Sequence, residues 1–174
     1  MSTKRIFFAL WPSDRQRDQL RNTITPVTKL IDGAAVFRGE WHVTLAFVGD
    51  FKESLIPALL HAAKLIRVEP FRLRFDRAEY WPRPKVGVLL APTVPPELTH
   101  LVLSLEILLS KIGIEPESRT FRPHITIARR ARPFETQRLA QPAIVEWSDF
   151  ELVESVKDPR GRLYRPISNA SAGT

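Results

Sequence analysis

His42-Val43-Thr44-Leu45 and His124-Ile125-Thr126-Ile127 are two copies of one pattern, histidine, apolar, threonine, apolar, 82 positions apart in a chain of 174 residues. Because side chains alternate between the two faces of a β-strand, the histidine and threonine of each copy share one face and the apolar residues point to the core. Composition alone would give two histidines this pattern about one time in a thousand. We therefore interpret the pair as an internal duplication that sets the fold.

The sequence around the two copies predicts strands mixed with helices and hairpins, without the strict alternation of a parallel fold. The class is therefore α+β. We expect helices at 13–33, 53–68 and 95–113, and strands at 4–11, 41–48, 71–75, 85–90, 124–128, 144–147 and 150–156. Gly49-Asp50 is expected to end the second strand, and a turn at 158–161 is expected to lead into a return strand with Tyr164.

The length favours one domain, which we place at 1–167, with the small polar residues 168–174 as a disordered tail. The apolar run 6–11 stops at Pro12, too short for a signal peptide or a membrane span, so a cytoplasmic protein is expected. The chain has no cysteine, which excludes a disulfide scaffold, a thiolate metal site and a cysteine nucleophile.

The charge is basic and carried mostly by arginine. The chain has 19 arginines, 7 lysines and a formal net charge of +7. Arginine's planar fork grips phosphate and stacks on bases, so a nucleic acid or phosphate ester is a plausible partner, although a solvated arginine-rich surface would read the same way.

Two histidines converging on one cleft are suited to phosphoester chemistry. With an unperturbed pKa near 6.5, one imidazole can be neutral and the other protonated near neutral pH, so either can serve as base or acid. No metal-ligand spacing accompanies them, and we expect neither a metal nor a cofactor. His61 and His100 fall in expected helices without a matching partner, and we give them no catalytic role.

The two motifs with their flanks resemble the two-histidine (2H) phosphoesterases, in particular the bacterial RNA 2′,3′-cyclic phosphodiesterases, also called 2′-5′ RNA ligases. The flanks are Arg38 to Gly49 around the first copy and Phe121 to Arg129 around the second. The opening strand, with Ala9-Leu10-Trp11-Pro12, and the closing segment, Ser155 to Tyr164, are similar to the family's terminal elements.

This resemblance implies a bilobal fold of two antiparallel sheets with outer helices, related by pseudo-two-fold symmetry around an active cleft. It implies opening of a 2′,3′-cyclic phosphate at a single-stranded or tRNA-like RNA end to leave a 2′-phosphate, by a monomer. His42 would protonate the leaving 3′ oxygen and His124 would activate water. The substrate-binding residues implied are Thr44, Thr126, Arg129 and Phe47.

Several alternatives remain open at this point. Phe47 and Arg129 each lie five positions after a motif histidine, so strict alternation places them on the opposite face. Core packing thus competes with base stacking for Phe47, whereas a turn can re-aim Arg129 at the strand end. Trp81 can be a stacking platform or a cover for the core. Reversible 2′-5′ RNA ligation, hydrolysis of a small cyclic nucleotide, or non-catalytic RNA binding are the alternative functions.

Overall fold

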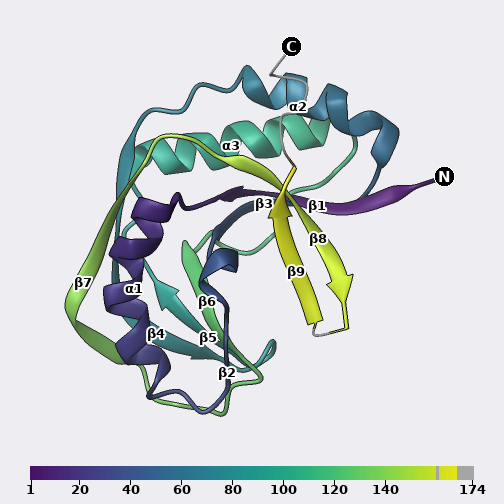
Figure 1. Cartoon of the computed structure of the whole chain (residues 1–174). Coiled ribbons are helices and arrows are strands. Elements are labelled where there is room, and N and C mark those ends of the chain that lie inside the picture. Colours follow the sequence, from purple (N-terminus) through teal and green to yellow (C-terminus); the bar gives the residue numbers. More distant parts are fainter. Residues whose placement is uncertain (160, 168–174) are drawn as a thin grey trace.

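The computed structural model describes residues 1–159 and 161–167, which form two antiparallel sheets with helices packed against their outer sides (Figure 1). One sheet, sheet A, has the strand order β3-β1-β8-β9, with β1 Thr3–Leu10, β3 Val43–Lys52, β8 Glu151–Asp158 and β9 Gly161–Pro166. The other, sheet B, has the order β2-β6-β5-β4-β7, with β2 Ala34–Ala35, β4 Phe71–Trp81, β5 Val86–Leu90, β6 His124–Arg129 and β7 Gln137–Trp147. The α+β class and the two antiparallel sheets are confirmed.

Three helices cover the sheets. Helix α1 (Asp14–Thr28) packs against β7 of sheet B, while α3 (Pro96–Lys111) packs against β3 of sheet A beside α2 (Ile56–Lys64). Short 3-10 turns, η1 (Arg38–Glu40) and η2 (Glu53–Leu55), precede β3 and α2. None of the helices in the described part of the chain is long and apolar enough to cross a membrane.

A capping box starts α1: Ser13 accepts from the Gln16 backbone N–H, and the Gln16 side chain accepts from the Ser13 backbone N–H. The helix ends five residues before Gly33, where it was expected to end, because the bonds tighten to Leu30 N–H→Val27 O and Ile31 N–H→Thr28 O. Gly33 instead permits a close approach of two backbones: an added Cβ would lie 2.9 Å from Ala131 Cα.

Strands β3 and β6, which carry the two motifs, each hold one extra residue at the same place. Opposite β3, Phe8 pairs with Ala46 and Ala9 with Thr44, which leaves Leu45 without a partner on β1. The same shift in β6 leaves Ile127 without a partner on β5. Both extra residues are third after the motif histidine. A β-bulge of this kind resets the alternation of side chains beyond it.

The two bulges determine which face of the sheet Phe47 and Arg129 occupy, a question that strand alternation left open. With one residue taken out of the pairing, Phe47 lies opposite Phe7 and shares the face of Thr44. Arg129 is brought to the face of Thr126 in the same way. Packing of Phe47 into the core is therefore excluded: its side chain is exposed, with the Arg5 guanidinium 4.7 Å from its ring centroid.

Other expected boundaries were wrong. Strand β3 does not end at Gly49-Asp50, because a second bulge at Val48 and Gly49, with Gly49 at φ +92°, lets it continue to Lys52. Strands β4 and β7 are longer than expected because they pair with each other over most of their length, and β4 continues to Trp81 instead of ending at Phe75. Strand β2 was not expected. The β8–β9 hairpin is present as expected; Arg160 of its turn and the tail 168–174 lie outside the described residues.

The bulge at Gly49 gives a stability prediction. Gly49→Ala should lower the free energy of unfolding by about 1–2 kcal/mol, because an L side chain at this positive φ is strained even where space is available. Gly49→Asn should cost less, since asparagine tolerates positive φ better. Urea denaturation of the three proteins measures both values; equal stability of Gly49→Ala and the wild type would contradict this account of the strand.

Candidate active site

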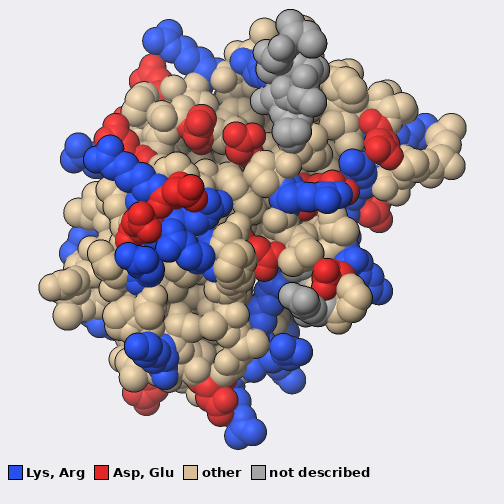
Figure 2. All heavy atoms as spheres, viewed as in Figure 1, with Lys and Arg blue, Asp and Glu red and all other residues tan. Residues whose placement is uncertain are grey.

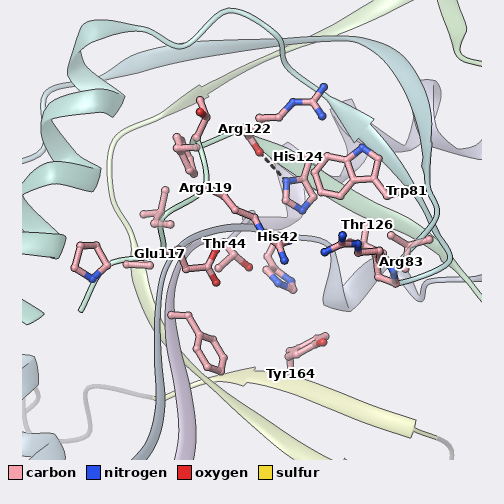
Figure 3. A pocket seen from close by; sticks show the side chains of 18 of the residues that line it. His42, Thr44, Trp81, Arg83, Glu117, Arg119, Arg122, His124, Thr126 and Tyr164 are labelled. Atoms are coloured by element: carbon pink, nitrogen blue, oxygen red, sulfur yellow. Dashed lines mark hydrogen bonds between the residues drawn. The ribbon is translucent and has the colours of Figure 1, made fainter. Parts of the chain in front are cut away.

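A cavity of about 850 Å³ lies between the two sheets, and both motifs line it (Figure 3). His42 and Thr44 enter from sheet A, and His124 and Thr126 from sheet B, with the two imidazoles near the centre of the view. Phe47 and Arg129 also line the cavity. The structure thus brings together all six residues that the sequence singled out.

The two histidines are held in the same way. His42 Nδ1 lies 2.7 Å from the carbonyl oxygen of Glu40, and His124 Nδ1 lies 2.7 Å from that of Arg122. A carbonyl oxygen can only accept, so each Nδ1 carries the hydrogen and donates it. Each neutral ring therefore has its lone pair on Nε2, which leaves two proton acceptors for the cavity.

Aromatic side chains contact both imidazoles. The ring centroids of Trp11 and Tyr164 lie 5.7 Å and 4.9 Å from that of His42, stacked and edge-on respectively. The Trp81 ring lies 4.3 Å from His124. Trp81 was left open between a core cover and a stacking platform; it lines the cavity and contacts a motif histidine. These rings take the place of water around both histidines.

The loss of water lowers both histidine pKa values. Burial, aided by the positive charges of His124 and Arg129 and opposed by the hydrogen bond to Glu40, lowers the pKa of His42 from 6.5 to about 4. Burial, then the charge of Arg122, also lowers the pKa of His124. Both imidazoles are therefore neutral at pH 7 in the free protein, unlike the one-neutral, one-protonated pair expected from unperturbed values. A negatively charged ligand in the cavity would raise these pKa values and so favour protonation of one of the two imidazoles.

Four arginines line the cavity: Arg83, Arg119, Arg122 and Arg129. In Figure 3, Arg83 lies on the side of Thr126, and Arg119 lies on the opposite side, near Thr44. Figure 2 shows basic side chains gathered in the hollow beside the β8–β9 hairpin. Among these arginines, the sequence singled out Arg129, and Arg122 lies within the flank of the second motif that carries the family resemblance. Arg83 and Arg119 lie in loops without a motif, and only the general arginine excess could have suggested them.

Two residues held near the motifs were missed. Tyr164 was noted only as part of the closing segment, and no sequence signal assigns its ring to His42. Glu40 lines the cavity with its carboxylate Oε1 accepting from the Tyr164 backbone N–H at 3.0 Å. His61 and His100, for which no catalytic role was expected, are exposed on α2 and α3 and are not among the residues that line the cavity.

This arrangement fits acid–base chemistry on a phosphate ester. Two Nε2 atoms can exchange protons with an attacking and a leaving oxygen, while hydroxyls and a guanidinium hold the non-bridging oxygens. Within residues 1–159 and 161–167, no three histidine or acidic side chains are grouped so that they could hold a metal ion.

Comparison with known proteins gives a consistent result. The family model described as the 2′-5′ RNA ligase superfamily matches residues 15–154. The RNA 2′,3′-cyclic phosphodiesterase of Escherichia coli (strain K12) is 34% identical over an alignment that covers 94% of this chain and 94% of that protein. The protein of the same name from Thermus thermophilus is 29% identical over an alignment that covers 96% of this chain and 89% of that protein. The crystal structure of E. coli LigT with 3′-AMP has a TM-score of 0.83 and 27% identity, covering 96% of this chain and 97% of that one.

The lowered pKa of His42 predicts a pH-dependent stability. Because the folded pKa of about 4 lies below the unfolded 6.5, the unfolded chain binds more protons between these values. Stability is therefore full above pH 6.5 and falls as the pH is lowered towards 4, by about 3 kcal/mol from this group. His42→Gln should flatten the stability curve in this window, whereas His61→Gln should not. Parallel curves for His42→Gln and the wild type in urea denaturation from pH 4 to 7 would refute the shift.

Proposed function

The chain belongs to the 2′-5′ RNA ligase superfamily, and we propose that it hydrolyses the 2′,3′-cyclic phosphate at an RNA end to a 2′-phosphate by acid–base catalysis with His42 and His124. The observation that carries this proposal is the matched pair of histidines in one cavity, each donating through Nδ1 to a carbonyl and keeping Nε2 for the substrate. The relatives named RNA 2′,3′-cyclic phosphodiesterase support the reaction.

The reaction exchanges one phosphorus–oxygen bond for another. His124 Nε2 takes a proton from water as the water oxygen bonds to phosphorus, and protonated His42 donates from Nε2 to the leaving 3′ oxygen. The product carries a 2′-phosphate and a 3′-hydroxyl, and solvent returns both histidines to their starting protonation states. Each proton transfer contributes about 10²–10⁴ in rate.

The remaining cavity residues have binding roles in this proposal. The hydroxyls of Thr44 and Thr126 hold non-bridging phosphate oxygens, and Arg129 stabilises the negative charge that develops on them. Phe47 stacks on the terminal base, for which its exposed ring on the cavity face is suited. The other arginines suit a polyanionic substrate, either single-stranded or tRNA-like RNA.

The acid role of His42 comes from the resemblance to the family, and the low pKa of His42 in the free protein opposes it. Since the cyclic phosphate carries a negative charge, binding raises the pKa of a nearby imidazole and offsets part of this opposition. The assignment therefore needs its own experiment, separate from the test of activity. A cytoplasmic location and a monomeric state remain predictions, as does the single domain 1–167.

The activity is tested with an RNA oligomer ending in a 2′,3′-cyclic phosphate, in the presence of EDTA. We expect a 2′-phosphate product, and a loss of turnover of at least about 10²-fold in His42→Ala and in His124→Ala. His61→Ala is the matched control and should keep the wild-type rate. Wild-type turnover in either motif variant would refute the mechanism; absence of turnover in the wild type would favour a non-catalytic RNA-binding module. A joined RNA product would favour ligation.

The roles of the two histidines are separated with a substrate whose bridging 3′ oxygen is replaced by sulfur. A thiolate leaves without protonation, so the variant that lacks the acid should be rescued on this substrate. We expect His42→Ala to recover at least about tenfold relative to its rate on the oxygen substrate, and His124→Ala to remain slow. Rescue of His124→Ala alone would reverse the assignment.

A further inference from the structure

The residue two positions before each motif histidine makes contacts in two directions. The backbone oxygens of Glu40 and Arg122 accept the Nδ1–H of His42 and His124. Their side chains reach other elements of the fold. In both cases the side chain contacts the residue whose ring covers the same histidine, Tyr164 on one side and Trp81 on the other.

On the first side, Glu40 ties the β8–β9 hairpin to the cavity. Its Oε1 accepts the backbone N–H of Tyr164 on β9 at 3.0 Å. The Tyr164 ring meets His42 edge-on at 4.9 Å and also lies under the Arg129 guanidinium, 5.2 Å away. Strand β9 is at the edge of sheet A, so this bond adds a tether to a strand that has one neighbour in the sheet.

On the second side, Arg122 belongs to a compact ion pair. Its Nη2 lies 3.1 Å from Glu79 Oε2, the same oxygen that accepts Nε1–H of Trp81 at 3.1 Å. The guanidinium lies 5.4 Å from the centre of the Trp81 ring, a cation–π distance. Trp81 is thereby fixed against His124, at a centroid distance of 4.3 Å.

We propose that Glu40 and Arg122 are positioning residues with two functions each. Each one fixes the tautomer of a motif histidine through its backbone oxygen and, through its side chain, holds in place the aromatic residue that shields the same histidine from water. The backbone oxygen fixes the hydrogen on Nδ1, and the side chain fixes the ring that covers the imidazole. Their importance for turnover rests on the proposed function, whereas their effect on the two imidazoles does not.

Several charged or titratable groups face His42, and the experiment has to separate them. His124 and Arg129 face it from β6, Tyr164 from β9 and Glu40 from η1. The Arg17 guanidinium of α1 lies 5.7 Å from the Trp11 ring, which stacks on His42. Glu40→Gln and Glu40→Ala remove the same charge, but the glutamine oxygen can still accept the Tyr164 N–H. The difference between them therefore isolates the tether.

The activity arm compares these two variants on the cyclic-phosphate RNA. We expect Glu40→Ala to lower kcat by about 10- to 100-fold with little change in KM, and Glu40→Gln to stay within about threefold of the wild type. Arg165→Ala is the matched control, because Arg165 is the next residue on β9 and pairs with Glu154 at 3.3 Å, outside the cavity lining. Equal losses in Glu40→Ala and Glu40→Gln would overturn the proposal.

A second arm needs no turnover: the pH titration of both imidazoles followed by NMR in the free protein. Glu40→Ala and Tyr164→Leu should let water reach His42 and move its pKa upward from about 4, while Glu40→Gln leaves it in place. Arg122→Ala should raise the pKa of His124, by removing the positive charge of Arg122 as well as by releasing the Trp81 ring, and should leave the pKa of His42 unchanged. Unchanged titrations would overturn the inference even if the wild type hydrolyses cyclic phosphate; shifted titrations in an inactive wild type would overturn only the proposed function.

Discussion

The register of the two motif strands, β3 and β6, determines which side chains reach the cavity. Within its motif, each of these strands has one residue without a partner on the neighbouring strand, Leu45 in β3 and Ile127 in β6. Without these bulges, the period of two would send Phe47 and Arg129 to the far face of their sheets. The backbone of the unpaired residue in β6 still forms a hydrogen bond outside the strand pairing: the Ile127 carbonyl oxygen accepts the Val36 N–H at 3.0 Å. The set of side chains that line the cavity is therefore determined by the backbone pairing of β3 and β6.

Burial of the two histidines has both a benefit and a cost. Aromatic rings exclude water from the imidazoles, which strengthens every electrostatic interaction with a bound phosphate. The same exclusion lowers both pKa values, so the free protein holds two neutral bases and no ready acid. An anionic ligand can supply the missing acid, since its negative charge raises the pKa of a nearby imidazole and so favours the imidazolium form. Protonation of the site is in this way coupled to the binding of an anion.

The sequence predicted what depends on local period and missed what depends on pairing. The His–Thr faces follow from alternation within four residues, and the helices from apolar spacing, so these parts could be predicted. A bulge is a mismatch between two strands, and neither strand's sequence contains its partner's register. The same limit applies to Tyr164, which is 122 positions from His42 and joins it only through the pairing of β8 with β1 and β9. Phe47 could be assigned to the cavity only after the register was known.

The two motifs share a backbone device and differ in the side chains attached to it. Both histidines donate to the carbonyl two residues before, but that residue is an anion in one copy and a cation in the other. Arg122 adds positive charge near His124, whereas His42 faces Arg129 across the cavity. A symmetric pair could exchange acid and base roles freely. Here the charges that lower the two pKa values differ: His124 and Arg129 act on His42, and Arg122 acts on His124, so the two imidazoles are not equivalent in the free protein.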